Sequence, residues 1–196
     1  MRRIVMMNWI SVDGYFAGPH GEIDWIVRDP QVDKALHESR SVPPNSGSAG
    51  SDTMLLGNRT YTMFENSWPQ IASDPSAPEE LHRLAQEVIG MTKIVFSQSR
   101  KEVPWANSKL LRGNLIGEVE QLKQGEGTPL LIFGSGTIVQ QLTDAGLIDE
   151  YFIAVTPVLL GKGKTLFGEV QKRNLRLLEA RSFKSGNVLL RYAASP

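Results

Sequence analysis

The amino-acid sequence predicts an α/β protein built on a mostly parallel β-sheet with an antiparallel C-terminal edge. Short apolar runs, typical of buried strands, alternate with helical patterns through about residue 150, and strand-like runs dominate after that point. In addition, three of the strand-like runs end in glycine or polar residues, where ligands of such sheets bind.

The first part of the chain predicts a strand over Arg3–Val12, which is rich in β-branched and large apolar residues and is expected at the centre of the sheet. The glycine-containing loop Asp13–Asp24 follows. Such a loop after a core strand can cover a ligand, or it can be a surface turn. Pro30–Arg40 has a short helical pattern, and Ser41–Asp52 has the composition of a surface connection.

The middle of the chain repeats the order of strand and helix. Thr53–Leu56 predicts a strand, and a helix begins after Gly57. Arg59, beside the free N–H groups of that helix, would suit a phosphate, and an exposed arginine without a ligand is the alternative. The next predicted elements are a connection at Pro69–Pro78, a helix at Glu79–Ile89, strands at Thr92–Phe96 and Ser108–Leu111, and a helix at Leu115–Lys123.

The stretch Leu130–Glu150 predicts a strand, a glycine turn and a helix in succession. Leu130–Phe133 is the strand, GSGT interrupts it, and a helix then continues to Gly146. Gly134 and Gly136 let a ligand approach the backbone closely, and the first N–H groups of the helix are free to bind an anion. An ordinary turn that uses glycine for its geometry is the alternative.

The last part of the chain predicts strands only. Asp149–Val155 is a strand, Gly161–Lys164 is a flexible basic turn, and Arg173–Ala180 with Val188–Ala193 predict an antiparallel hairpin.

The strand ends at Gly57, Ser97 and Gly134 are expected on one edge of the sheet. Ser97, Gln98 and Arg100 could hold the 2′-phosphate of an NADP-type cofactor, or they could form a solvated polar turn. Three such signals on one edge predict a dinucleotide site more strongly than any one of them.

Composition narrows the class of protein. The 196 residues predict a single domain over residues 1–196, with 21 basic and 21 acidic residues, so the net charge indicates neither nucleic-acid nor membrane binding. There is no cysteine, and the three histidines are scattered, so no metal site is expected. No run approaches the length of a membrane span, and no signal peptide is recognised, so a cytoplasmic location is expected.

Five segments resemble those of one family, in the family's order and over nearly the whole chain. They are ISVDGYFAGPHGEIDW (Ile10–Trp25), LLGNRTYTMF (Leu55–Phe64), KIVFSQS (Lys93–Ser99), IFGSGTIVQQLTDAGLIDEYFIAVTPVLLGKGKTLF (Ile132–Phe167) and VLLRY (Val188–Tyr192). The family is the dihydrofolate reductase-like group that includes the C-terminal reductase domain of the bifunctional riboflavin-biosynthesis enzyme. The chain is most similar to its stand-alone bacterial members.

The resemblance implies a mixed sheet of about eight strands with flanking helices, an NADPH-dependent reductase and commonly a homodimer. Carried over by motif, the residues at the cofactor would be Gly57, Asn58, Arg59, Thr60, Ser97, Gln98, Gly134, Ser135, Gly136 and Thr137. The predicted substrate-binding residues are Val12, Asp13, Gly14, Tyr15 and Trp25.

The chain departs from the family at three places. Riboflavin-pathway reductases usually have DGK where this chain has Asp13-Gly14-Tyr15, and they tend to have an acidic residue where it has Ile132-Phe133. These departures predict a substrate other than the riboflavin-pathway pyrimidine, either a small heterocycle or a carbonyl compound. Asn58, where the family often has arginine, could weaken the preference for NADPH over NADH.

The proton donor for such a reduction is open among Asp24, Asp29 and Asp33, which follow the first loop, and at most one of them serves. Each could instead cap a helix or carry a surface charge. Two other functions remain as alternatives: a nucleotide-binding protein of the same fold without turnover, and an interaction module whose glycines only serve geometry.

Overall fold

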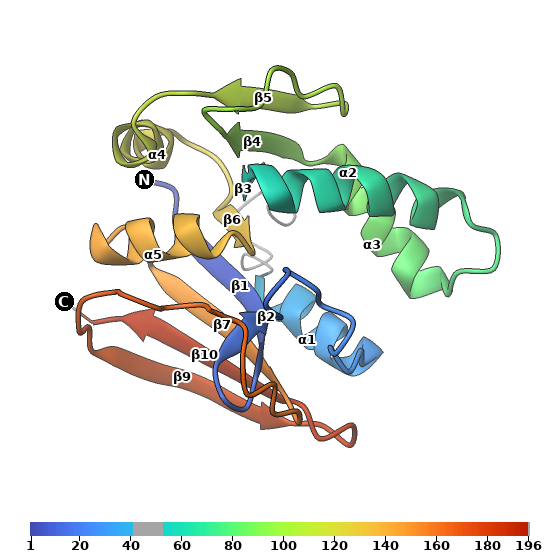
Figure 1. Ribbon diagram of the computed structural model, residues 1–196. Helices are drawn as coiled ribbons and strands as arrows, with labels where there is room; N and C mark the ends of the chain where they lie inside the picture. Colours follow the sequence, from blue (N-terminus) through green and yellow to red (C-terminus); the bar gives the residue numbers. More distant parts are fainter. Residues whose placement is uncertain (41–52, 196) are drawn as a thin grey trace.

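The computed structural model describes residues 1–40 and 53–195 and has three layers, with one large sheet between two layers of helices (Figure 1). The predicted connection at Ser41–Asp52 lies outside the described residues. The strands of the large sheet are β1 (Ile4–Ser11), β3 (Thr53–Gly57), β4 (Thr92–Phe96), β5 (Ser108–Leu111), β6 (Leu130–Phe133), β7 (Glu150–Thr156), β9 (Leu175–Ser182) and β10 (Val188–Ala194).

The eight strands lie in the order β5-β4-β3-β6-β1-β7-β10-β9. In this order the strands from β5 to β7 run parallel to one another, and β10 is antiparallel to both β7 and β9. β1 lies inside the sheet, with Ile4 opposite Leu130 of β6 and Val5 opposite Glu150 of β7. The structure therefore confirms the mostly parallel sheet with an antiparallel C-terminal edge.

Helices cover both faces of the sheet (Figure 1). One face packs against α1 (Pro30–Arg40), α2 (Asn58–Ser73) and α3 (Glu79–Gly90), and the other against α4 (Leu115–Gln124) and α5 (Gly136–Asp144). Successive side chains of a strand point to opposite faces. Val5 and Met7 of β1 accordingly join the first core cluster, whereas Ile4 and Met6 join the second.

Two elements differ from the sequence prediction. α2 continues through Pro69 to Ser73, so the predicted connection at Pro69–Pro78 is wrong in its first part. Trp68 packs against the core, and this tertiary contact outweighs the local effect of the proline. In the second case, β2 (Tyr15–Ala17) and β8 (Lys164–Thr165) form a small antiparallel sheet where the sequence predicted a loop and a flexible turn.

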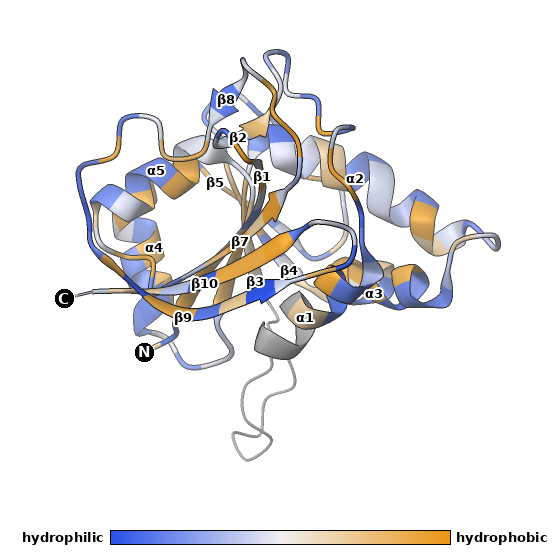
Figure 2. Cartoon of the chain, turned by 90° about the horizontal axis from the view of Figure 1, so that it is seen from below, coloured by the Kyte–Doolittle hydropathy of each residue, from blue (hydrophilic) through white to orange (hydrophobic). Residues whose placement is uncertain are grey.

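The outer edge of the sheet is open. Almost every residue of β9 is exposed, and no helix in the described ranges covers this strand. Figure 2 shows apolar segments along β9 and β10, and the large apolar side chains exposed on β9 are Leu175, Leu177 and Leu178. Within residues 1–40 and 53–195, no helix is long and apolar enough to cross a lipid bilayer.

Candidate functional site

A groove of about 960 Å³ opens where β3, β4 and β6 end and where α2 and α5 begin. Its lining includes nine of the ten residues predicted to hold a cofactor, namely Gly57, Asn58, Arg59, Thr60, Ser97, Gln98, Ser135, Gly136 and Thr137. The tenth, Gly134, lines the cavity that adjoins the groove. The three predicted strand ends thus lie together at one edge of the sheet, where ligands of open α/β sheets bind.

The turn after β6 is hydrogen-bonded to the end of β3. Ser135 has a φ of 61°, in the left-handed region, and its Oγ atom accepts a 2.8 Å hydrogen bond from the backbone N–H of Gly57. The same Oγ lies 2.9 Å from the hydroxyl oxygen of Thr60. A Cβ atom on Gly57 would lie 2.5 Å from Ser135 Oγ, so this close approach needs glycine. The hydrogen bonds of Ser135 therefore fix the distance between the turn after β6 and the boundary between β3 and α2.

The N-terminus of α5 faces the groove. Gly136 and Thr137 line the groove, and the side chain of Ser135 does not cap the helix. The Ser135 carbonyl accepts from the N–H groups of Ile138 and Val139. A helix start that lines a groove without a side-chain cap has N–H groups and a positive dipole end to offer an anion.

The charge of the groove is positive. Among its lining residues the charged side chains are Arg59 and Lys164, and none is acidic. Arg100 lies near this edge but is already engaged, since it forms a 2.7 Å ion pair with Glu65 and donates to the side-chain oxygens of Asn58 and Thr62. Arg59 is exposed, so it can reach a bound anion.

The predicted residues Ser97 and Gln98 also organise the loop that carries them. Ser97 Oγ accepts from the backbone N–H of Arg100, and Gln98 Nε2 donates to the carbonyl of Arg112. They hold the far end of the groove in shape while lining it.

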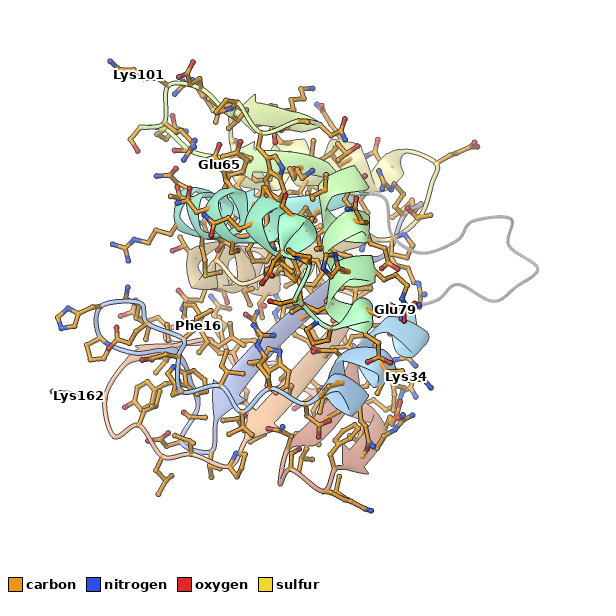
Figure 3. The ribbon with its side chains drawn as sticks, turned by 90° about the vertical axis from the view of Figure 1, so that its right-hand side faces the viewer. Phe16, Lys34, Glu65, Glu79, Lys101 and Lys162 are labelled. Carbon is orange, nitrogen blue, oxygen red and sulfur yellow. The ribbon has the colours of Figure 1, made fainter. Side chains whose placement is uncertain are left out.

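A second, smaller cavity of about 200 Å³ adjoins the groove and is mostly apolar. It shares Phe16, Thr60 and Ser135 with the groove, so these residues mark the junction. Phe16, labelled in Figure 3, comes from β2, and a Cβ on Gly136 would lie 2.8 Å from its ring. The apolar lining is Met7, Trp9, Phe16, Ile23, Ile26, Met63, Phe64, Trp68, Leu84, Val88 and Phe133.

Few polar side chains line this cavity. Asn8 of β1 is 9% exposed, and its Nδ2 atom donates to Met6 Sδ at 3.2 Å. The Arg28 guanidinium lies 5.8 Å from the centroid of Trp9, and Asp33 of α1 contributes a half-buried carboxylate.

The three predicted proton donors have different positions. Asp33 lines the cavity. Asp29 precedes α1, where its Oδ1 accepts from the backbone N–H of Gln31, so it has the role of a helix cap. Asp24 is exposed and lines neither the groove nor the cavity. Of the three, Asp33 is thus the one that lines the cavity.

The predicted substrate-binding residues line neither space. They are Val12, Asp13, Gly14, Tyr15 and Trp25, and the structure gives them supporting positions instead. Val12 is exposed, Gly14 takes a positive φ of 86° in the turn, and the Trp25 indole donates to the Glu22 carbonyl.

Asp13 clasps the loop between β7 and β8. Its carboxylate accepts from the backbone N–H groups of Leu160 and Gly161 and from the Ser11 hydroxyl. The Ser11 hydrogen bond, followed by those from the backbone, holds the pKa of Asp13 below its usual value. This clasp joins the loop after β1 to the loop before β8, and so holds the small β2–β8 sheet over the junction.

Sequence reasoning missed Asn8, Phe16 and Lys164. A signal for Asn8 was present, because it is a polar residue within an otherwise apolar central strand. Phe16 follows the predicted Tyr15, and neighbouring residues of a strand point to opposite faces, so Phe16 lines the cavity and Tyr15 does not. Lys164 comes to the groove only through pairing of β8 with β2, which no local pattern indicates. Across the described ranges, no group of three or more histidine, cysteine or acidic residues could hold a metal ion.

Comparison with known proteins agrees with this architecture. A family model described as the RibD C-terminal domain matches residues 2–189. The uncharacterized protein YyaP of Bacillus subtilis (strain 168) is 30% identical over 97% of this chain and 94% of its own length. The uncharacterized protein YwjB of the same organism is 26% identical over 93% and 92%, respectively.

Solved structures show the same fold. A candidate riboflavin biosynthesis protein from Shewanella sp. PV-4 is 24% identical, with a TM-score of 0.66 over the whole of both chains. A pyrimidine reductase-like protein from Corynebacterium diphtheriae NCTC has a TM-score of 0.64 at 12% identity over all of this chain and 92% of its own. These likenesses confirm the predicted dihydrofolate reductase-like fold.

A third neighbour is a longer enzyme from Thermotoga maritima, a diaminohydroxyphosphoribosylaminopyrimidine deaminase and 5-amino-6-(5-phosphoribosylamino)uracil reductase. It is 15% identical with a TM-score of 0.66, and the match covers 99% of this chain but 57% of the enzyme.

Proposed function

Because this chain belongs to the RibD C-terminal domain family, we propose that it is an NADPH-dependent reductase of a small heterocyclic or carbonyl-bearing molecule. The observation that carries the proposal is the junction of two unlike spaces. A positively charged groove at the helix starts meets an apolar cavity across Phe16, Thr60 and Ser135. A dinucleotide in the groove and a substrate in the cavity would meet at that junction.

The residues of the groove suit NADPH. The turn of Gly134, Ser135, Gly136 and Thr137 would hold the pyrophosphate, since it combines a helix N-terminus with glycines. Arg59, at the start of α2, would supply the cation for a phosphate, and Ser97 with Gln98 would lie at the adenosine 2′-phosphate. Asn58 is neutral, and its side-chain oxygen accepts a hydrogen bond from Arg100, so Asn58 adds no positive charge for a 2′-phosphate. NADH would therefore also be accepted, though more weakly.

The chemistry follows from this arrangement. When bound, the reduced nicotinamide supplies a hydride, so the substrate gains a hydride and a proton and the cofactor leaves oxidised. The apolar cavity excludes water and fixes the acceptor against the junction. Asp33 is the acidic residue that would hold a proton at the substrate, because it alone of the three candidates lines the cavity.

The test is titration with NADPH and, separately, NADH, followed by thermal shift and nucleotide fluorescence. NADPH at 100 times its dissociation constant should stabilise the protein by about 2.7 kcal/mol. Arg59→Ala should weaken NADPH binding by roughly tenfold, the effect of about 1.4 kcal/mol. Arg181→Ala, in the remote strand β9, is the matched control and should bind normally.

The outcomes separate the functions. Binding of neither nucleotide would overturn the reductase proposal. Tight NADPH binding with no oxidation across a panel of heterocycles and carbonyl compounds would instead favour a nucleotide-binding protein without turnover. Loss of turnover in Asp33→Asn with NADPH binding intact would support the assignment of the proton donor.

A further inference from the structure

The size of the cavity limits its ligand. Its volume is about 200 Å³, against about 960 Å³ for the groove. An apolar cavity of roughly 150 Å³ is enough to hold benzene. The cavity therefore accommodates one ring or two fused rings, and a ribosyl phosphate attached to such a ring would have to lie outside it.

The charges of the cavity disfavour a phosphate. The ionisable residues that line it are Arg28 and Asp33, which have opposite signs, and the rest of the wall is largely aromatic and aliphatic. A phosphate would meet one cation and one carboxylate in an otherwise apolar space, and burying such a charge without full pairing is costly. The phosphate-binding features lie instead in the groove, with Arg59 and Lys164.

Asn8 provides a neutral group for recognition. This residue lies on the central strand, is nine-tenths buried and is one of those that line the cavity. The hydrogen bond that its Nδ2 atom makes is to the Met6 thioether, which is a weak acceptor. Its Oδ1 atom lies 3.9 Å from the Cβ position of Gly134, and so next to the junction with the groove.

A primary amide matches a cyclic amide. It offers an N–H donor and a carbonyl acceptor side by side, and a ring that carries adjacent N–H and C=O groups presents the complementary pair. A buried amide in an apolar cavity should discriminate strongly, because a ligand without this edge leaves it unpaired.

We propose that the substrate is a flat, uncharged and unphosphorylated compound of one or two fused rings, whose cyclic-amide edge is hydrogen-bonded by Asn8. This inference rests on the proposed reductase function for the role of the cavity. Asn8 determines specificity at the end of the cavity that adjoins the groove, and the apolar walls hold the ring.

Three probes test the inference by binding alone. Quinazolinone is a neutral fused ring with a cyclic-amide edge, methoxyquinazoline has nearly the same shape without the N–H donor, and uridine monophosphate carries a ribosyl phosphate. Trp9 and Trp68 line the cavity, so tryptophan fluorescence reports entry of a ring, and calorimetry gives the affinity. The expected order is quinazolinone, then methoxyquinazoline about tenfold weaker, with uridine monophosphate weakest.

A variant of Asn8 tests whether this residue recognises the cyclic-amide edge. Asn8→Leu keeps the branched shape and the number of heavy atoms of the side chain and removes both hydrogen-bonding groups, so quinazolinone should bind about tenfold more weakly and methoxyquinazoline unchanged or better. Asn66→Leu, on the exposed side of α2, makes the same change outside the cavity and should leave all affinities as in the wild type. If Asn8→Leu does not fold, the three probes on the wild-type protein still test the proposed class of substrate.

Different experimental results would contradict the inferred class of substrate and the proposed reductase function. Uridine monophosphate binding as tightly as quinazolinone, or equal binding of the two neutral probes, would overturn the substrate class while NADPH binding stands. Absence of NADPH binding would overturn the reductase, whatever the probes do, because NADPH is measured in the groove and the probes in the cavity.

Discussion

Ser135 Oγ accepts a 2.8 Å hydrogen bond from the backbone N–H of Gly57, although the two residues are 78 positions apart in the chain. Ser135 belongs to the turn after β6, whereas Gly57 is the last residue of β3, directly before α2. A single hydroxyl thus sets the distance between the two strand ends that we propose to hold the cofactor phosphates. This relationship leads to the first prediction.

Ser135→Ala should lower the free energy of unfolding by about 2 kcal/mol, because the Gly57 N–H loses its acceptor, while the strain of the left-handed backbone is the same for serine and alanine. Ser135→Gly loses the same hydroxyl but suits a φ of 61°, so it should be more stable than the alanine variant by about 1 kcal/mol. Urea denaturation measures both. An alanine variant as stable as the glycine variant would contradict the strain at this position.

Gly136→Ala should weaken NADPH binding and destabilise the protein, since the new methyl group would lie 2.8 Å from the Phe16 ring. Phe16→Leu in the same chain removes the ring atoms concerned and should restore stability. Gly90→Ala is the control, because nothing lies within 4 Å of its Cβ position at the end of α3. It should stabilise the helix by about 0.5 kcal/mol. Thermal shifts with and without NADPH separate the two effects.

Lys93 gives the stability of the fold a pH dependence. Its side chain is fully buried on β4, where Nζ donates to the carbonyls of Ile89 and Ala106 and lies 4.1 Å from the Trp105 ring centroid. Burial lowers the pKa of Lys93 from its usual 10.5 to about 8. Between these values the unfolded chain binds the proton more strongly, so the free energy of unfolding rises with pH.

Lys93→Met should remove this rise. The difference in unfolding free energy between wild type and variant should be constant below about pH 8, and should then shift in favour of the wild type by at most about 1.4 kcal/mol per pH unit. Chemical denaturation at a series of pH values from neutral to alkaline measures the slope. A difference that stays constant throughout would show that the Lys93 amine is not perturbed.

Asp13→Asn should loosen the clasp on the loop before β8. The neutral amide keeps one acceptor oxygen but loses the charge that strengthens the hydrogen bonds from Leu160 and Gly161. The Ser11 hydrogen bond, followed by those from Gly161 and Leu160, lowers the pKa of Asp13 below its usual value of 3.8. The stability that the clasp contributes is therefore present above pH 3.8 and is lost as the pH falls through the lowered pKa of the folded state. Faster amide exchange at Leu160 and Gly161 in the variant, with core amides unchanged, is the expected result.

The exposed edge of β9 predicts a homodimer. Leu177 is 52% exposed there, between two further exposed leucines, and an open apolar strand edge readily pairs with another strand. Leu177→Lys should shift the protein to a monomer in sedimentation. Leu159→Lys changes an even more exposed leucine outside the strand and should leave the dimer intact. A wild-type chain that sediments as a monomer would contradict the prediction.

Much of the fold could be predicted from the sequence because its strands are short apolar runs bounded by strong turn residues. β4, β5 and β6 begin and end at the predicted residues, as does α1. The edge of the sheet that carries the groove was also predictable, since parallel strands end on the same side.

The cavity was harder to predict, because long-range pairing forms it. Phe16 and Lys164 reach the site only when β2 pairs with β8, two segments almost 150 residues apart whose glycines resemble those of ordinary turns. The choice among the aspartates depended on where each lies relative to α1, because Asp33 is on this helix whereas Asp24 and Asp29 precede it, and spacing alone does not fix which one faces the cavity. For Asn8, the sequence shows a polar residue in an apolar strand, but it does not show which residues lie next to it in space.

The position of β1 has a consequence for synthesis. β1 is synthesised before both of its partners, Leu130–Phe133 and Glu150–Thr156, so Ile4 can pair only with a residue made 126 positions later. Until then a largely apolar strand has neither of its partners, and strands in such unpaired states are prone to aggregation. The core of this protein therefore assembles after most of the chain has been translated, and a chain arrested before residue 130 would leave its central strand without either partner.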